Sequence, residues 1–195
     1  MWARIHESGI RAESITGEWN PVGPVAIIHA RELDAAPAVV FYDRQTATLY
    51  FAHRAGGEWN IEEVLDGLPE DNRYDQAGRT RLAIAAQSTG FWIAASPNLL
   101  LWGRPGEWEI VSDSLWGKGL DLLATRDGRV FALSTSDSET SPPSMIELDE
   151  GEIGESADLT GLSEPGFVTD SRRWDIVEND ESRPVALVLA EQLDP

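Results

Sequence analysis

The chain has 195 residues, 42% of them hydrophobic and 25% charged, which suffices for one domain with a substantial core and excludes wholesale disorder. Its formal net charge of −19 argues against binding to nucleic acids or anionic membranes, because phosphate-rich surfaces repel acidic ones. Cysteine is absent, which excludes disulfides, thiolate metal sites and cysteine nucleophiles.

Short apolar runs bounded by glycine, aspartate and proline follow one another along the chain, and their length predicts β-strands rather than helices. We interpret residues 3–7 and 10–19 as outer strands and residues 38–42 as the first inner-type strand. The apolar pair before His29 places this histidine in a strand as well. Further strands are expected at residues 49–54, 82–86, 91–95, 99–104, 120–124, 130–133, 174–177 and 185–189. The sequence therefore predicts an all-β protein.

A Gly-Glu-Trp triplet marks an internal repeat. It occurs at residues 17–19, 57–59 and 106–108, with a degenerate Gly-Glu-Ile copy at residues 151–153. The copies are 40, 49 and 45 residues apart, close to the ~40–45 residues of a four-stranded propeller blade. In two copies an apolar strand ends on Arg54 or Arg104 before the glycine turn. Because glycine supplies the positive φ of a tight hairpin, each triplet is expected to join two antiparallel strands.

The order of the strands indicates how the repeats close. The first strands are of the outer type and the last, at 174–177 and 185–189, are of the inner type, so the two sets are able to pair within one mixed blade. We therefore predict one domain over residues 1–195, a β-propeller of four blades closed within one chain. The alternative is a half-propeller completed by a second chain, which would make the protein self-associate. A polar, proline-containing stretch at residues 134–144 is expected to form an exposed, mobile loop.

Three segments of one repeat carry a resemblance to a known architecture. They are Tyr42-Asp43 after an apolar strand, the Leu-Tyr-x-Ala strand at residues 49–52, and the Gly-x-Trp turn at residues 57–59. In this order they resemble the tandem β-propeller repeats of many bacterial proteins, over roughly residues 10–160. The resemblance implies an architecture and no particular activity.

Acidic residues are concentrated in one stretch of the chain. Residues 130–171 contain ten of them and no lysine or arginine. We expect Glu147, Asp149 and Glu150 to dock a basic segment of a protein partner. The alternatives are a solvated face that serves solubility and a Ca²⁺ site built from oxygen ligands. A regular Asp-x-Asp-x-Asp loop is absent, which weakens the case for Ca²⁺, and no cofactor is expected.

Tryptophan is abundant, with eight residues. The tryptophans of the repeated triplet and Trp92, which lies inside an apolar run, are expected in the core. Trp2, Trp102, Trp116 and Trp174 depart from the repeat rule. Of these, Trp102, Trp116 and Trp174 are our candidate anchors for a partner, the alternative being that they fill the core.

Motifs for catalysis are missing from the sequence. The nearest approach to a nucleophile elbow, residues 154–158, lacks its second glycine, and no Gly-x-Gly-x-x-Gly follows a strand. The three histidines are not paired at metal-ligand spacing. No apolar run approaches the ~18 residues of a membrane-spanning helix, and no secretory signal is recognisable, so a cytoplasmic protein is expected.

These observations favour a non-enzymatic, soluble interaction or scaffold module whose acidic surface docks a protein partner. One alternative is a carbohydrate-binding propeller, in which an aromatic and a polar side chain would recur in every blade. Another is a propeller hydrolase or lactonase with a metal ion in the central tunnel.

Overall fold

A computed structural model describes the backbone of residues 2–6, 9–13, 22–29, 37–43, 46–67, 82–95, 99–113, 119–135, 144–158 and 173–189. Side chains are described for residues 37–43, 46–67, 82–95, 99–113, 121–134, 144–157 and 176–185. Within these ranges the chain forms sixteen strands and no helix. The prediction of an all-β protein is confirmed.

Twelve strands form three antiparallel sheets of four consecutive strands each. The first sheet contains β3 (Val22–His29), β4 (Pro37–Asp43), β5 (Thr48–Ala55) and β6 (Glu58–Leu65). The second contains β7 (Leu82–Gln87), β8 (Gly90–Ala95), β9 (Leu99–Arg104) and β10 (Glu107–Ser112). The third contains β11 (Gly119–Ala124), β12 (Val130–Thr135), β13 (Ser144–Asp149) and β14 (Glu152–Asp158).

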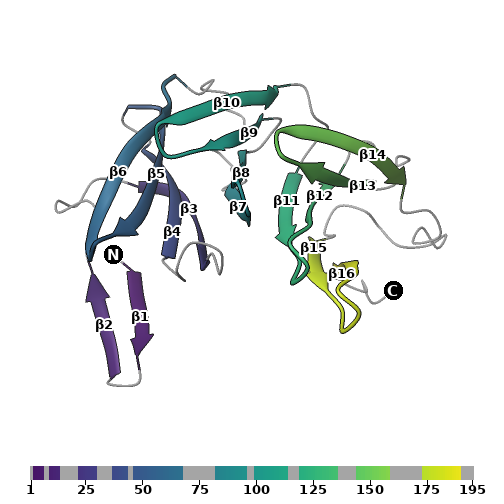
Figure 1. The fold of residues 1–195 in the computed structure, drawn as a ribbon, viewed down its shortest axis with the longest axis horizontal. Coiled ribbons are helices and arrows are strands. Elements are labelled where there is room, and N and C mark those ends of the chain that lie inside the picture. Colours follow the sequence, from purple (N-terminus) through teal and green to yellow (C-terminus); the bar gives the residue numbers. More distant parts are fainter. Residues whose placement is uncertain are drawn as a thin grey trace, which may run out of the picture.

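The sheets follow one another around an open arc (Figure 1). Their first strands lie side by side, because β7 contacts both β3 and β11. Two hairpins, β1 (Trp2–His6) with β2 (Gly9–Glu13) and β15 (Arg173–Glu178) with β16 (Pro184–Leu189), lie at the two ends of the arc. Each hairpin is a separate two-stranded sheet. The repeat of four-stranded antiparallel sheets is therefore observed, whereas the described strands do not form a ring closed within one chain.

One strand of the first sheet differs in position from the prediction. Residues 38–42 were expected as the first inner strand, but they belong to β4, the second strand. The first strand is β3, and it includes His29, which was predicted to belong to a strand. Its ladder with β4 shifts in register between Val22 and Val25. Gly23 and Pro24 lie in this shift and interrupt the apolar pattern, which conceals the start of the strand.

The repeated triplet marks the same turn in all three sheets. Two-residue turns join the third strand to the fourth, and each ends in a glycine, at Gly57, Gly106 and Gly151. The φ angles of these glycines are +90°, +84° and +91°. The expected hairpins are thereby confirmed for three copies, while the copy at residues 17–19 lies outside the described residues. The two arginines are not equivalent, since Arg54 pairs with Trp59 but Arg104 pairs with Glu107.

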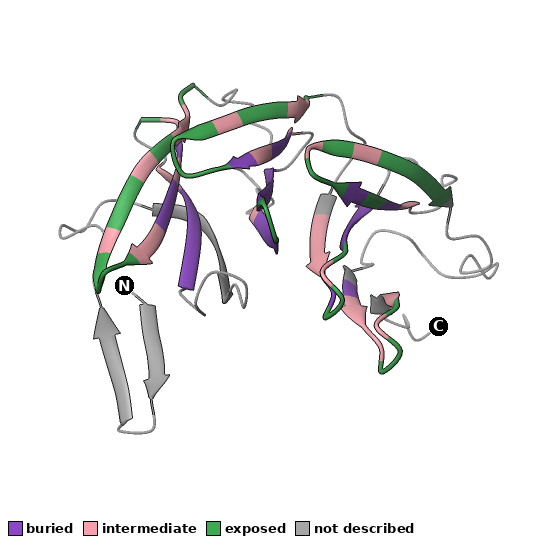
Figure 2. Ribbon diagram, in the orientation of Figure 1, coloured by how far each residue is buried: buried purple, intermediate pink, exposed green. Residues whose placement is uncertain are grey.

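Two apolar cores separate the three sheets. Alternate residues of a strand point to opposite faces of its sheet, so Phe91 and Trp92 of β8 serve different cores. The core between the first and second sheets contains Ala38, Val40, Leu49, Phe51, Ile84, Ala86, Phe91, Ile93 and Leu101. The core between the second and third contains Ala83, Ala85, Trp92, Ala94, Leu100, Val130, Ala132, Ile146 and Leu148. Figure 2 shows that burial decreases from these inner strands towards β6, β10 and β14.

The outermost strands carry much of the negative charge. β6, β10 and β14 together contain eight acidic residues and no lysine or arginine. Exposed charge on an edge strand discourages pairing with the edge of another sheet. The charge on these three strands therefore disfavours edge-to-edge pairing with another sheet.

The polar stretch predicted as a loop at residues 134–144 is shorter than expected. Ser134 and Thr135 belong to β12, and Ser144 begins β13. Ser134 pairs with Ser144 across the ladder and is buried. The ladder continues into the polar stretch because backbone hydrogen bonds do not depend on the side chain. Residues 136–143 lie outside the described residues.

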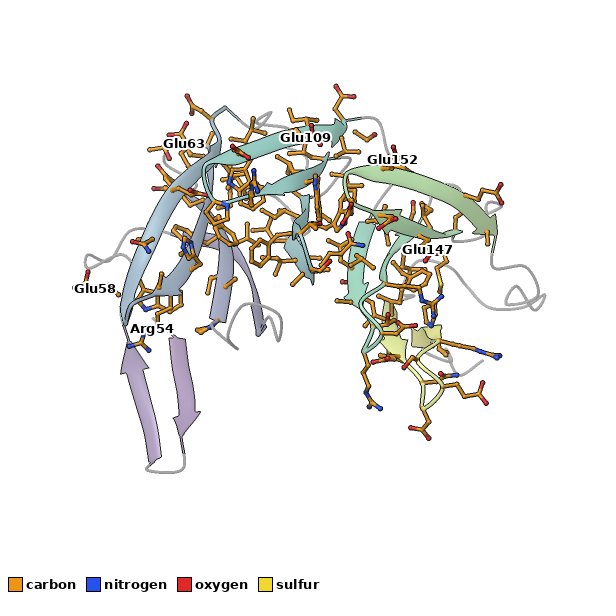
Figure 3. The ribbon with its side chains drawn as sticks, in the orientation of Figure 1. Arg54, Glu58, Glu63, Glu109, Glu147 and Glu152 are labelled. Carbon is orange, nitrogen blue, oxygen red and sulfur yellow. The ribbon has the colours of Figure 1, made fainter. Side chains whose placement is uncertain are left out.

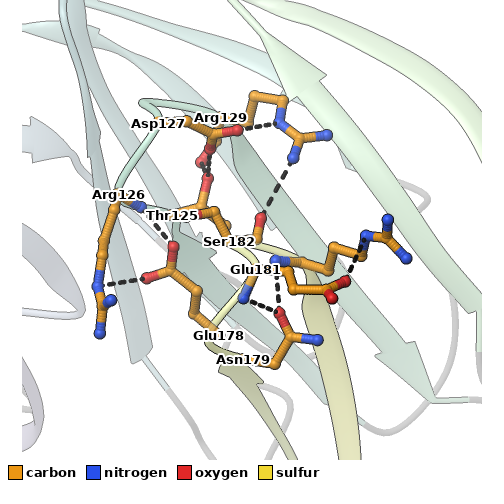
Figure 4. Close-up of polar contacts among 9 residues, drawn as sticks. Thr125, Arg126, Asp127, Arg129, Glu178, Asn179, Glu181 and Ser182 are labelled. Atoms are coloured by element: carbon orange, nitrogen blue, oxygen red, sulfur yellow. Dashed lines mark hydrogen bonds and ion pairs between the residues drawn. The ribbon is translucent and has the colours of Figure 1, made fainter.

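Two five-residue turns share one backbone pattern, at residues 125–129 between β11 and β12 and at residues 179–183 between β15 and β16 (Figure 4). In each turn the first N–H donates to the fifth carbonyl, at 2.8 and 2.9 Å, and the fourth N–H donates to the first carbonyl, at 3.0 and 3.1 Å. The fourth residue has positive φ in both, at Gly128 and Ser182. The hydroxyl of Thr125, together with Arg129, holds the pKa of Asp127 below its usual value of 3.8.

Candidate functional site

A solvent-open groove of about 450 Å³ lies over the outer part of the second sheet and the neighbouring turn of the third. It is lined by Thr89, Trp102, Gly103, Arg104, Glu107, Trp108, Glu109 and Glu150. The first seven come from the second sheet and its turns, and Glu150 comes from the turn between β13 and β14. The groove therefore depends on how two sheets are packed together.

Trp102 is held in place by close approaches to glycine. Its ring centroid lies 4.9 Å from that of the buried Trp92, with the two rings tilted by 44°, and a Cβ added to Gly90 would lie 3.0 Å from its ring. A Cβ added to Gly151 would lie 2.9 Å from the same side chain. A side chain at either glycine would displace the indole, so both glycines shape the groove. Because neither glycine carries a side chain, the partly buried Trp102 ring fits beside both of them.

A buried amide joins the second sheet to the turn that carries Glu150. The Gln87 side chain is 8% exposed and donates to Asp149 Oδ1 at 2.8 Å. Its oxygen accepts from Trp92 Nε1 at 3.3 Å and from the Glu150 backbone N–H at 3.1 Å. Two of these hydrogen bonds fix the β13–β14 turn against β7, and the bond from Trp92 in β8 orients the amide. Burial of the amide without these partners would be unfavourable.

Trp108 forms the other aromatic wall and faces the first sheet. Its ring lies 5.0 Å from that of Phe51, and its indole N–H donates to Glu62 Oε1 at 2.6 Å. Gly103 lies opposite Trp108 in the ladder, and an added Cβ there would come 2.9 Å from its ring. Trp108 is thereby anchored by packing and by a hydrogen bond while one part of it lines the groove.

The charge of the groove is negative. Three carboxylates line it, those of Glu107, Glu109 and Glu150, against one guanidinium, that of Arg104. Arg104 binds Glu107 through Nε and Nη2 at 2.8 and 2.6 Å, so its charge is already matched. Figure 3 shows Glu63, Glu109 and Glu152 along the outer strands, whereas Glu147 lies on the inner side of β13. The groove therefore combines two indole side chains with a net negative charge.

The structure brings together some of the predicted site residues and not others. Trp102 and Glu150, 48 positions apart in the sequence, both line the groove. Asp149 lies beside it and accepts the hydrogen bond from Gln87. Glu147 is exposed opposite Phe131 and is not among the lining residues. Trp116 lies outside the described residues, and for Trp174 the structure describes the backbone in β15 alone.

Several lining residues were not singled out by the sequence. Glu107 and Trp108 were assigned to the packing of the repeat and Arg104 to the end of a repeated strand, while Thr89 and Glu109 were not chosen as site residues. The ladders supply the missing signal. Relative to the turns, Trp102 occupies the same ladder position as His53 and Glu147, two residues before the last pair of the hairpin. A large aromatic residue at that position distinguishes the second sheet.

The other predicted chemistries find no support in the described part of the chain. Within it, no group of three or more histidine, aspartate or glutamate residues is arranged to hold a metal ion. The same residues include no helix with the length and apolar character needed to cross a bilayer. No known family model matches the sequence, and comparison with curated proteins and with solved structures finds no match.

Proposed function

We propose that this chain is a non-enzymatic interaction module of the β-propeller type, and that its groove binds an arginine-containing segment of a partner protein. The observation that carries the proposal is the groove's composition, two indoles and three carboxylates around a hollow large enough for a side chain. Successive four-stranded sheets with adjoining first strands support the propeller assignment.

Arginine fits both features of the groove. A guanidinium stacks on tryptophan through cation–π attraction, and it binds carboxylates through charge-assisted hydrogen bonds. Arg104 does not oppose it strongly, because Glu107 already neutralises that charge. The hydrogen bond from the Glu150 backbone N–H to Gln87 reduces the ordering cost of binding, since the carboxylate is presented from a turn held by Gln87.

The test uses two matched pairs of substitutions and a short arginine-rich peptide. Glu109→Gln with Glu150→Gln removes two charges from the groove, and Glu58→Gln with Glu63→Gln removes two from exposed positions on β6. Titration calorimetry should show affinity reduced by about tenfold, or ~1.4 kcal/mol, in the first pair. The second pair should retain affinity within about twofold, because distant surface charges are screened by salt.

Equal weakening by both pairs would attribute binding to overall charge and contradict the groove. A peptide in which citrulline replaces arginine should lose binding to the unsubstituted protein. A glycan array that shows no binding at high protein concentration would exclude the carbohydrate-binding alternative. The equivalents of Trp102 in the first and third sheets are His53 and Glu147, so an aromatic platform is not repeated, and this favours a single peptide site over a lectin.

A further inference from the structure

The hairpin β15–β16 has the features of the first half of a fourth sheet. β15 lies beside β11, just as β11 lies beside β7 and β7 beside β3. Ile176 of β15 is buried against Phe131 and Leu133 of the third sheet. The turn at 179–183 repeats the turn at 125–129, which joins the first two strands of the third sheet. This hairpin therefore corresponds to a first and second strand.

Side-chain contacts hold that hairpin on the third sheet (Figure 4). The backbone N–H of Arg126 donates to Glu178 Oε1 at 2.8 Å, and Arg126 Nε lies 3.6 Å from the second oxygen of the same carboxylate. Arg129 donates to the Ser182 carbonyl at 3.2 Å. The first half of the fourth sheet is thus fixed in position, with β16 as its outer strand.

The hairpin β1–β2 has the order expected of a second half. Directly before each of the first strands β7, β11 and β15 comes a hairpin that supplies the third and fourth strands of the preceding sheet. β1–β2 stands in the same relation to β3, the first strand of the first sheet. By this order its strands correspond to a third and a fourth strand.

The two half-sheets lie at opposite ends of the arc and do not pair with each other (Figure 1). Between them are two packed cores, and one of these also contains the three hydrogen bonds of Gln87. Bringing the two hairpins of one chain together would require these interfaces to repack. A second copy related by a two-fold axis would satisfy both hairpins without such a change, because each copy offers what the other lacks.

We propose that two copies of this chain complete each other, with β16 of one copy pairing with β1 of the other at two equivalent junctions. Each junction then becomes a four-stranded sheet, and the two arcs form one ring of eight sheets. Strand edges at both junctions are covered by main-chain pairing. This interface is independent of the proposed groove, which lies in the middle of the arc.

The register of the third sheet indicates which residues meet at each junction. In that sheet Val130, the first residue of the second strand, pairs with Leu148, the residue before the end of the third. Pro184 is the first residue of β16 and pairs with Glu178, just as Val130 is the first residue of β12 and pairs with Ala124. Pro184 is therefore the equivalent of Val130. Transfer of the register places Pro184 opposite Ile5 and hence Ala186 opposite Ala3. Residues paired in this way bring their Cα atoms within the ~4.4–6.8 Å that a disulfide spans.

A natural absence of cysteine makes this junction easy to test. Two single variants, Ala3→Cys and Ala186→Cys, are prepared separately, mixed under mild reduction and then oxidised at low micromolar concentration. We expect a disulfide-linked species of about twice the 21.4 kDa chain mass from the mixture, and much less from either variant alone. Light scattering of the unsubstituted chain should likewise give a mass of two chains.

The double variant Ala3→Cys with Ala186→Cys distinguishes the outcomes. Oxidation to a monomer with an internal disulfide would show closure within one chain and overturn the proposal. A chain mass of 21.4 kDa in solution, with no cross-link in the mixture, would overturn it equally. Binding of the arginine-rich peptide, measured on the same samples, reports on the groove separately, so failure of one proposal is not mistaken for failure of the other.

Discussion

The two interfaces between the three complete sheets are built in different ways. Between the first and second sheets the contact is aromatic, with the Phe51 ring 4.9 Å from Phe91 and 5.0 Å from Trp108. Its hydrogen bond from Trp108 to Glu62 lies towards the exposed margin. Between the second and third sheets, the tilted aromatic contact of Trp92 with Trp102 is joined by the buried amide of Gln87.

This difference shows that the contacts that hold two sheets together need not be the contacts that fix their relative orientation. Apolar contacts are not directional, so the first interface is stabilised by the area that it buries. Hydrogen bonds are directional, and Gln87 makes three of them with groups from two sheets. The turn that carries Glu150 is therefore oriented more strictly than the corresponding part of the first interface, and the groove lies where that orientation is fixed.

The largest expected effect comes from removing one aromatic core residue at a time from β8. Trp92→Ala and Phe91→Ala should each reduce the free energy of unfolding by about 3–5 kcal/mol, because each leaves a cavity at a fully buried site. Hydrogen exchange should distinguish the two variants by the strands that each one destabilises. Trp92→Ala is expected to accelerate exchange in β12 and β13, and Phe91→Ala in β4 and β5. Acceleration of the same strands by both variants would mean that the two cores are not independent.

The next effect concerns the buried amide. Gln87→Leu should cost about 2–3 kcal/mol in urea unfolding, since the Trp92 and Glu150 donors lose their acceptor. Gln87→Glu keeps an acceptor oxygen but places a second carboxylate beside Asp149, so its stability should recover as the pH falls towards 4. A neutral outcome for Gln87→Leu would show that the second interface is held by packing alone.

A smaller effect is expected at the margin of the first interface. Glu62→Ala removes the acceptor of Trp108 and should cost about 1 kcal/mol, because water replaces part of the lost hydrogen bond. Glu62→Gln retains an acceptor and should lie within about 0.5 kcal/mol of the parent protein. Urea denaturation of both variants checks the prediction, which fails if the glutamine variant is as unstable as the alanine variant.

The smallest effect is pH-dependent and lies in the turn between β11 and β12. Because the pKa of Asp127 is lowered in the folded chain, its ionised form stabilises folding above pH 3.8, and this contribution is lost as the pH falls through the depressed value. Asp127→Asn should therefore be less stable than the parent near neutral pH and equal to it under strong acid. Denaturation series at several pH values test this. A difference that persists unchanged below the depressed pKa would contradict it.

The strands and their hairpins were predictable because they depend on local chemistry. A glycine at the second turn position is required by positive φ, and the Glu-Trp that follows begins a strand in two sheets. The strand β3 was recognised near His29 only, because Gly23 and Pro24, which lie in a register shift of the strand, have the composition of a loop. Because β3 was omitted, residues 38–42 were predicted as the first strand of the sheet, whereas they belong to the second.

The groove was only partly predictable because it depends on contacts between sheets. Trp102 and Glu150 were each chosen for chemical character, but their proximity follows from Gln87, a residue without any motif. Aligning the repeats on Arg54 and Arg104 also displaced the ladder by one position. In a strand a shift of one residue exchanges the two faces, so the shared position of His53, Trp102 and Glu147 could not be recognised from that alignment.

The acidic outer strands have a consequence for synthesis on the ribosome. Each complete sheet is a run of consecutive strands, and its most charged strand is the last of the four to emerge. Until then the nascent chain exposes the edge of a largely apolar third strand, such as β9. Arrival of the glutamate-rich strand covers that edge before translation of the following sheet is complete, so aggregation between neighbouring nascent chains is limited to a short interval for each sheet.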